Sequence, residues 1–228
     1  MNNLKTGDYC LSGFCQEDFG VTAKCLMRFC SQFQTKELLI WDTNLGVNRT
    51  SFAAGTNILD TEGVLTFNYQ AAHRMSCVVS SFITDVQTNV IVTIERNDNN
   101  SWIEGLLYLD QILSQCHCQR TAIFELGLLV LKLSQALNAV VLNVADEDDE
   151  ALSISKTHPI LLPSLLGAYD QKWLTELSPQ LVRAGAFVED SQEGQLLVWV
   201  QHPDDFLSDK VPNPEIFRIL QQYLLAAL

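Results

Sequence analysis

The chain has 228 residues, which is the size of one large domain or two small ones. Hydrophobic residues make up 47% of the sequence and charged residues 18%, a composition that excludes a disordered, collagen-like or coiled-coil protein. The 27 Asp and Glu residues outnumber the 14 Lys and Arg residues and give a net charge of −13. Such a charge disfavours direct binding to a nucleic-acid backbone and suits a basic partner.

The sequence contains no recognisable targeting signal. Residues 1–8 lack the basic stretch and the following apolar run of a secretory signal. The two most apolar segments, Leu126–Val144 and Leu220–Leu228, are interrupted by polar residues or too short to span a bilayer. Seven cysteines are an odd number, and without an export signal reduced thiols are the default state. We therefore expect a cytoplasmic protein with no membrane partner.

The first part of the chain predicts an antiparallel sheet with one early helix. Acidic residues Glu17 and Asp18 lead into a helix whose apolar residues recur at spacings of mostly three and four up to Phe33. Short apolar or alternating segments predict strands, and the last two of them read as a hairpin with a longer loop. These strands are expected at Tyr9–Phe14, Leu38–Trp41, Val64–Tyr69, Cys77–Ile83 and Val90–Ile94.

Helices are predicted in the middle of the chain. Ser101 and Glu104 match a capping box, in which the serine hydroxyl accepts the backbone N–H of Glu104, and a helix would follow to Leu113. A second helix is expected from about Thr121 to Asn138, and because it is apolar nearly all round it should be central. Ala139–Val144 then reads as a buried strand.

The C-terminal part predicts short helical pieces, a second hairpin and a last helix. Asn213 and Pro214 suit the N-cap and first position of that helix. The other expected segments are helical pieces around Pro163–Tyr169 and Lys172–Leu177 and a hairpin of Ala184–Val188 with Gln195–Gln201. Together these patterns predict one α+β domain over residues 1–228, with antiparallel sheet packed against helices. Any joint between two lobes falls near residues 145–163.

The sequence contains no familiar catalytic motif and only one weak candidate for a metal site. Cys116, His117 and Cys118 place three potential zinc ligands together, but structural zinc sites usually contain C-x₂₋₄-C pairs. Cys25 and Cys30 would lie about 140° apart around a helix and cannot easily share a metal. Small buried hydrophobic residues are the favoured interpretation of the cysteines, with a metal, redox or nucleophilic role as the alternative. No nucleophile elbow, H-E-x-x-H, Walker A or G-x-G-x-x-G motif occurs, so we expect no catalytic residue, cofactor or bound metal.

Acidic clusters are the strongest signal outside the predicted core. A continuous run consists of Asp146, Glu147, Asp148, Asp149 and Glu150. Its plain interpretation is a solvated loop, and its functional interpretation is a docking patch that attracts a basic partner. A predicted surface turn contains Glu189, Asp190 and Glu193, and its plain interpretation is solvated charge. As with the acidic run, the functional interpretation is that these residues bind the partner. Apolar contacts could come from Trp41, Trp173 and Trp199, each of which is equally suited to the core.

The C-terminal third contains a sequence pattern typical of a known family. Its parts are Trp173-Leu174-Thr175-Glu176-Leu177-Ser178, then Glu193-Gly194-Gln195-Leu196-Leu197-Val198, a loop with Phe206, Asn213-Pro214 and a terminal amphipathic helix. This pattern resembles bacterial polymorphic-toxin immunity proteins, including those paired with restriction-endonuclease-like toxins delivered by type VI secretion. The resemblance implies that the protein is no enzyme and that it neutralises a cognate toxin by covering its active site or substrate face. The alternative is a small cytoplasmic enzyme or metal-binding domain that uses Cys116, His117 and Cys118.

Overall fold

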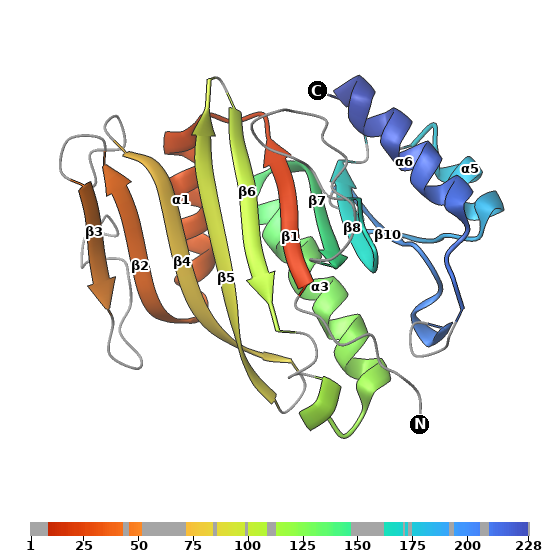
Figure 1. The fold of residues 1–228 in the computed structure, drawn as a ribbon, viewed down its shortest axis with the longest axis horizontal. Helices are drawn as coiled ribbons and strands as arrows, with labels where there is room; N and C mark the ends of the chain where they lie inside the picture. Colours follow the sequence, from red (N-terminus) through yellow and green to blue (C-terminus); the bar gives the residue numbers. More distant parts are fainter. Residues whose placement is uncertain are drawn as a thin grey trace.

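The computed structural model describes residues 9–42, 46–51, 72–83, 86–98, 100–108, 113–146, 162–170, 172, 175–191, 194–205 and 210–227. Within these residues, a single ten-stranded sheet forms the centre of the molecule, in the order β3-β2-β4-β5-β6-β1-β7-β8-β10-β9 (Figure 1). Every neighbouring pair of strands is antiparallel. The strands are β1 Tyr9–Cys15, β2 Gln34–Asp42, β3 Gly46–Ser51, β4 Ala72–Ile83, β5 Val86–Asn97, β6 Asn100–Leu107, β7 Ala139–Asp146, β8 Leu166–Asp170, β9 Phe187–Asp190 and β10 Gln195–Trp199.

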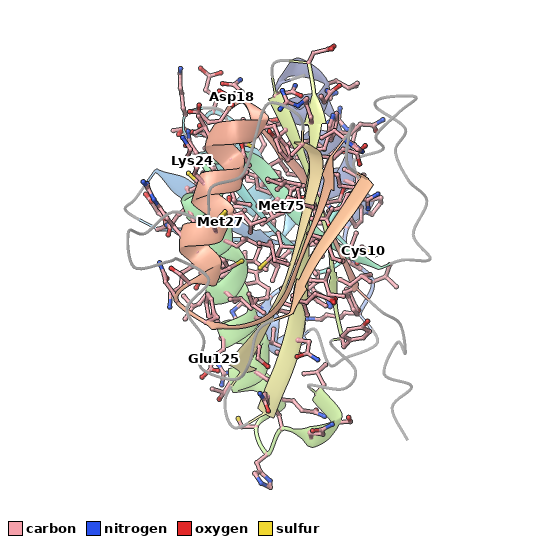
Figure 2. The ribbon with its side chains drawn as sticks, turned by 90° about the vertical axis from the view of Figure 1, so that its left-hand side faces the viewer. Cys10, Asp18, Lys24, Met27, Met75 and Glu125 are labelled. Carbon is pink, nitrogen blue, oxygen red and sulfur yellow. The ribbon has the colours of Figure 1, made fainter. Side chains whose placement is uncertain are left out.

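The helices cover the two faces of the sheet unequally. Helices α1 (Phe19–Cys30) and α3 (Gln119–Leu137) lie side by side on one face, as Figure 2 shows. Helices α5 (Ser178–Ala184) and α6 (Pro214–Ala227) lie on the other face, over the end of the sheet that contains β7, β8 and β10 (Figure 1). A short 3-10 helix, η1, spans Pro203–Asp205. The two faces therefore have separate hydrophobic cores.

Alternation along the strands assigns each residue to one of these cores. In β10, Leu197 and Trp199 pack in the core beneath α1 and α3, whereas Leu196 and Val198 pack in the core beneath α5 and α6. Successive side chains of a strand point to opposite faces, so a strand covered on both faces is apolar throughout. All five residues of β10 are accordingly buried.

Local signals in the sequence account for the ends of the helices. The backbone N–H groups of Gly20 and Val21 donate to Asp18 Oδ1 at 2.7 and 3.1 Å, which caps the start of α1. Helix α3 ends at Asn138, whose φ of 52° lies in the left-handed region that asparagine tolerates. The Glu215 N–H donates to Asn213 Oδ1 at 3.0 Å, so Asn213 caps α6 as its sequence position predicts.

Most of the expected elements are present, and the α+β fold class is confirmed. The strand predictions at the start of the chain correspond to β1 and β2, the central apolar helix to α3, and the strand after it to β7. Strands β4 and β5 form the expected hairpin, but their pairing continues to Ile83 and Val86, so the loop is shorter than predicted. Strands β9 and β10 form the second hairpin. The predicted strand Val64–Tyr69 lies outside the described residues.

The predicted helix after Ser101 is wrong, because Asn100–Leu107 is strand β6. Ser101 is fully buried, and its hydroxyl donates to the carbonyl of Glu17 at 3.2 Å instead of capping a helix. Glu104 pairs across the sheet with Thr93 of β5 and Ser12 of β1. The S-x-x-E spacing is therefore fortuitous, and the tertiary pairing on both sides of β6 overrides it.

The helical piece predicted around Pro163–Tyr169 is also wrong. Leu166–Asp170 is strand β8, which is held between β7 and β10 and buried at four of its five positions. Lys172 is helical, in agreement with the first residue of the predicted Lys172–Leu177 piece, whereas residues 175–177 form a turn and helix α5 begins at Ser178. Strands β7 and β8, which lie on either side of most of the predicted lobe joint near residues 145–163, pair in the same sheet. Residues 147–161 of that joint lie outside the described residues. In the described part of the chain, no helix is long and apolar enough to cross a membrane.

The contact between α3 and β10 generates a test of the packing. A Cβ at Gly127 would lie 2.5 Å from Cζ2 of the fully buried Trp199 ring. We expect Gly127→Ala to destabilise the protein by about 1–3 kcal/mol through overpacking, although alanine normally favours a helix over glycine by about 1 kcal/mol. Urea unfolding followed by tryptophan fluorescence measures the change. The exposed neighbour variant Leu128→Ala should change little, and a Gly127→Ala protein as stable as the wild type would contradict this packing.

Candidate binding face on the open side of the sheet

One side of the sheet's centre carries no described helix. On β4, β5, β6 and β1, the residues that point toward α1 and α3 are buried in a core, and the alternate residues point the other way, toward the viewer in Figure 1. We call this second set the open face. Its members are Cys10, Ser12, Arg74, Ser76, Val78, Ile91, Thr93, Glu95, Glu104 and Leu106.

A row of polar residues, three of them small, crosses the middle of the open face. Ser76 pairs with Thr93, Thr93 with Glu104, and Glu104 with Ser12. The Thr93 hydroxyl donates to Ser76 Oγ at 2.9 Å, and both side chains are buried between larger neighbours. The side chains of Ser12, Ser76 and Thr93 are short and buried, whereas that of Glu104 is exposed.

An apolar row runs beside the polar one. Val78 pairs with Ile91, Ile91 with Leu106, and Leu106 with Cys10. Each of these four side chains is half-buried, although no described helix lies over them. Half-exposed apolar side chains suit the centre of a protein interface, which is more apolar than the rest of the surface.

Charged residues border the polar row on its other side. Arg74 pairs with Glu95 across β4 and β5, and Arg74 Nη2 lies 3.7 Å from Glu104 Oε2. Both members of this ion pair are substantially exposed, so it contributes at most about 1 kcal/mol. The open face thus carries one basic and two acidic side chains. Its boundary on this side is the contact between the rings of Phe14 and Trp102, whose centroids are 5.8 Å apart in the core beneath α6.

Of the acidic run that was predicted as a docking patch, the structure describes only the first residue, Asp146. Asp146 is the last residue of β7, and its backbone pairs with Tyr9 of β1. Glu147, Asp148, Asp149 and Glu150 lie outside the described residues. Asp146 therefore ends the strand next to β1, the last strand of the open face.

The residues of the second acidic cluster, Glu189, Asp190 and Glu193, do not share one environment. Glu189 lies on the edge strand β9 and is half-buried, and its Oε2 accepts a hydrogen bond from Trp199 Nε1 at 3.1 Å. It satisfies a buried indole, so the expectation of simply solvated charge is wrong for this residue. Asp190 is exposed, and Glu193 lies outside the described residues. Trp199 itself is core, whereas the side chains of Trp41 and Trp173 are not described.

The cysteine and histidine residues after β6 lie at the start of α3. Cys118 is exposed at the N-cap position, His117 is exposed and Cys116 is half-buried. The Thr121 hydroxyl lies 3.1 Å from Cys118 Sγ and donates to it. This hydrogen bond, backbone N–H groups at the helix start and the charge of Arg120 hold the pKa of the Cys118 thiol below its ordinary value. Among the described residues, no three His, Cys, Asp or Glu side chains are grouped to hold a metal ion.

The buried cysteines have the opposite character. Desolvation raises the pKa of Cys15, which lies in the core near the Thr22 hydroxyl at 3.2 Å. Burial likewise raises the pKa of Cys30, which neighbours Cys77 between α1 and β4. These residues behave as the small core hydrophobes that the sequence favours.

Sequence reasoning did not identify the open face. Its members come from four strands that are far apart in the sequence, and each strand contributes two or three of them. One local signal was present: along β4, Ser76 and Val78 alternate with the buried Met75, Cys77 and Val79. That alternation indicates a strand with one face away from the core.

Comparison with known proteins adds no relative. No protein-family model matches the sequence, and no curated protein or solved structure is significantly similar to it.

The environment of Cys118 generates a test by thiol chemistry. A lowered pKa means a larger thiolate fraction at neutral pH, so Cys118 should react with iodoacetamide much faster than the buried Cys15. Thr121→Val removes the hydroxyl donor, should raise the pKa of Cys118 and should slow its alkylation at neutral pH. Mass spectrometry of timed samples over a pH series measures both rates. An unchanged pH profile in Thr121→Val would show that the hydrogen bond does not act on this thiol.

Proposed function

We propose that this protein binds and neutralises a basic bacterial toxin, as an immunity protein, and that the open face of the sheet covers the toxin's active site or substrate face. The observation that carries the proposal is the open face itself. The same strands are fully covered by α1 and α3 on their other side, yet here they present half-buried apolar residues with no described helix over them. Antiparallel sheets tolerate one solvated face, but such a face is ordinarily polar throughout.

The composition of the open face suits a protein partner. The apolar row of Val78, Ile91 and Leu106 would form the dry centre of the interface, and the charged residues would form its rim. The Thr93–Ser76 hydrogen bond satisfies the polar row internally, so these hydroxyls can be covered without losing a partner.

Charge supports the same kind of partner. The chain has a net charge of −13, and the open face contributes Glu95 and Glu104 against Arg74. A toxin that cleaves nucleic acid must present a basic substrate face, because that face follows a polyanion. Attraction between the two surfaces would speed their encounter, while apolar contacts would slow dissociation. The resemblance of the C-terminal third to immunity proteins points to the same activity.

The direct experiment pairs the protein with a catalytically inactive form of the toxin encoded beside its gene. We expect a stable complex by size-exclusion chromatography and rescue of growth when the active toxin is co-expressed. Absence of both complex and rescue would refute the proposal for that toxin.

The position of the interface is tested by a substitution on the open face. Leu106→Arg puts a bulky charge into the apolar row, so it should increase the dissociation rate at least about tenfold, which corresponds to about 1.4 kcal/mol. Val182→Arg is the matched control, because it adds the same charge at an exposed apolar residue of α5. Surface plasmon resonance measures both rates. Equal dissociation of the two variants would place the interface elsewhere.

The acidic run should act mainly on association. Neutralising Asp146, Glu147, Asp148, Asp149 and Glu150 to Asn or Gln should slow association with the toxin and flatten its dependence on salt. Dissociation should change less, because long-range steering does not require contact. Stopped-flow mixing with the inactive toxin at low and high salt measures both effects. Identical association rates and salt slopes would leave the run as a solvated loop.

A further inference from the structure

The outer side of the α1–α3 layer carries exposed basic and apolar residues, in contrast to the acidic chain as a whole. Val21, Lys24 and Arg28 follow one another at helical spacing on α1 and are exposed, and Leu128 and Lys132 do the same on α3. Figure 2 shows the two helices side by side on this face of the sheet, with Lys24 on the side of α1 away from the strands. We call these five residues the helical face.

The two helices bring these residues to the same level. Asn138 Nδ2, just beyond α3, donates to Glu17 Oε1, just before α1, at 3.3 Å, so the end of α3 lies beside the start of α1. With a rise of about 1.5 Å per residue, Lys132 is about 9 Å from that contact along its helix, between the levels of Val21 and Lys24. Leu128 and Arg28 are each about 15 Å from it. The exposed residues of α1 and α3 therefore lie at matching levels on adjacent helices.

The helical face is basic in a strongly acidic protein. Helices α1 and α3 contain four basic residues, Lys24, Arg28, Arg120 and Lys132, and one acidic residue, Glu125, which gives 4 − 1 = +3 in a chain of net charge −13. Arg120 lies at the far end of α3 and pairs with Asp204 at 2.5 Å. Arg28 and Lys132 make no side-chain hydrogen bond or ion pair with any described residue. Their charges are therefore available to a partner.

Apolar side chains stand between these charges. Val21 is 41% exposed and Leu128 is 53% exposed, and the half-buried Cys25 and Leu131 lie on the same helices. Single exposed apolar residues are ordinary on a protein surface. Here the two stand on adjacent helices that also carry Arg28 and Lys132, and Leu128 is one turn from Lys132, a pattern that suits an amphipathic helix.

We infer that the helical face is a docking surface for an acidic amphipathic helix of another protein, which would lie across α1 and α3. Charge complementarity selects this occupant: its apolar stripe would contact Val21 and Leu128, and flanking carboxylates would pair with Arg28 and Lys132. A twofold contact with a second copy would oppose basic residues to basic residues. An anionic membrane is disfavoured, because such surfaces recruit clusters of about four to eight basic residues. The inference is independent of the proposed toxin binding, which uses the opposite side of the sheet.

A synthetic helix tests the inference on the full-length protein. The probe is a fluorescein-labelled amphipathic peptide of about 18 residues, long enough to form a helix, with a leucine stripe flanked by glutamates. A control peptide has every glutamate replaced by lysine. Fluorescence anisotropy should show saturable binding of the acidic peptide and none of the basic peptide, and amide chemical-shift changes should map to α1 and α3.

Variants of the protein separate specific docking from general charge attraction. Leu128→Asp, and separately the double variant Arg28→Glu with Lys132→Glu, should weaken binding of the acidic peptide at least about tenfold. The control Val211→Asp changes a residue that is 88% exposed elsewhere and should bind like the wild type. Unchanged unfolding midpoints would confirm that each variant folds. Absence of peptide binding, or equal binding by Leu128→Asp and Val211→Asp, would overturn the inference. Concentration-dependent self-association that Leu128→Asp abolishes would assign the face to a second copy and also overturn it.

Discussion

Strand β1 hydrogen-bonds with strands from two distant parts of the chain, and the continuity of the sheet depends on this pairing. Tyr9–Cys15 pairs with residues 101–107 of β6 on one side and with residues 139–146 of β7 on the other. The backbones approach so closely that a Cβ at Gly13 would lie 2.1 Å from the carbonyl oxygen of Val141. Glycine is therefore required at this position, next to the register shift between Phe14 and Cys15. Such long-range closure makes folding slow relative to local hairpins.

The same strand determines where the open face ends. Leu11 of β1 contributes to the core beneath α1 and α3, whereas Phe14 contributes to the core beneath α6. The contact of Phe14 with Trp102 extends that second core as far as β6. Beyond Trp102, the neighbouring positions are Glu95 and Arg74, which are charged and partly exposed. The transition from aromatic to charged residues along one cross-strand row therefore separates the α6-covered part of the sheet from the open face.

The sequence predicts elements whose signal is local and fails where tertiary pairing decides. Helix α3 is predicted correctly because a long apolar segment is unambiguous, and α6 because Asn213 and Pro214 mark its start. Strand β6 was missed because Ser101 and Glu104 imitate a capping box, although both residues belong to cross-strand pairs. Strand β8 was missed because a strand buried on both faces lacks the alternation by which strands are recognised.

The candidate site was harder to predict than the fold for a related reason. Acidic residues were the visible signal in the sequence, and Glu189 was proposed from it as a partner-binding residue. In the structure Glu189 accepts a hydrogen bond from Trp199. The open face depends on the strand order β4-β5-β6-β1, and no local pattern reveals that the first strand of the chain lies beside the sixth. Once that order is known, the cross-strand rows follow directly from the register.

Opposite charges on opposite faces are compatible with two partners at once. The open face has an acidic balance, and the helical face has a basic one, with the sheet and the α1–α3 layer between them. A sheet and a packed helix layer place these surfaces more than about 10 Å apart, which exceeds the screening length of about 8 Å at physiological ionic strength. Partners of the two proposed surfaces would therefore be attracted largely independently of each other. Any coupling between the two would have to pass through the packed side chains that join α1 to β4, such as Cys30 and Cys77.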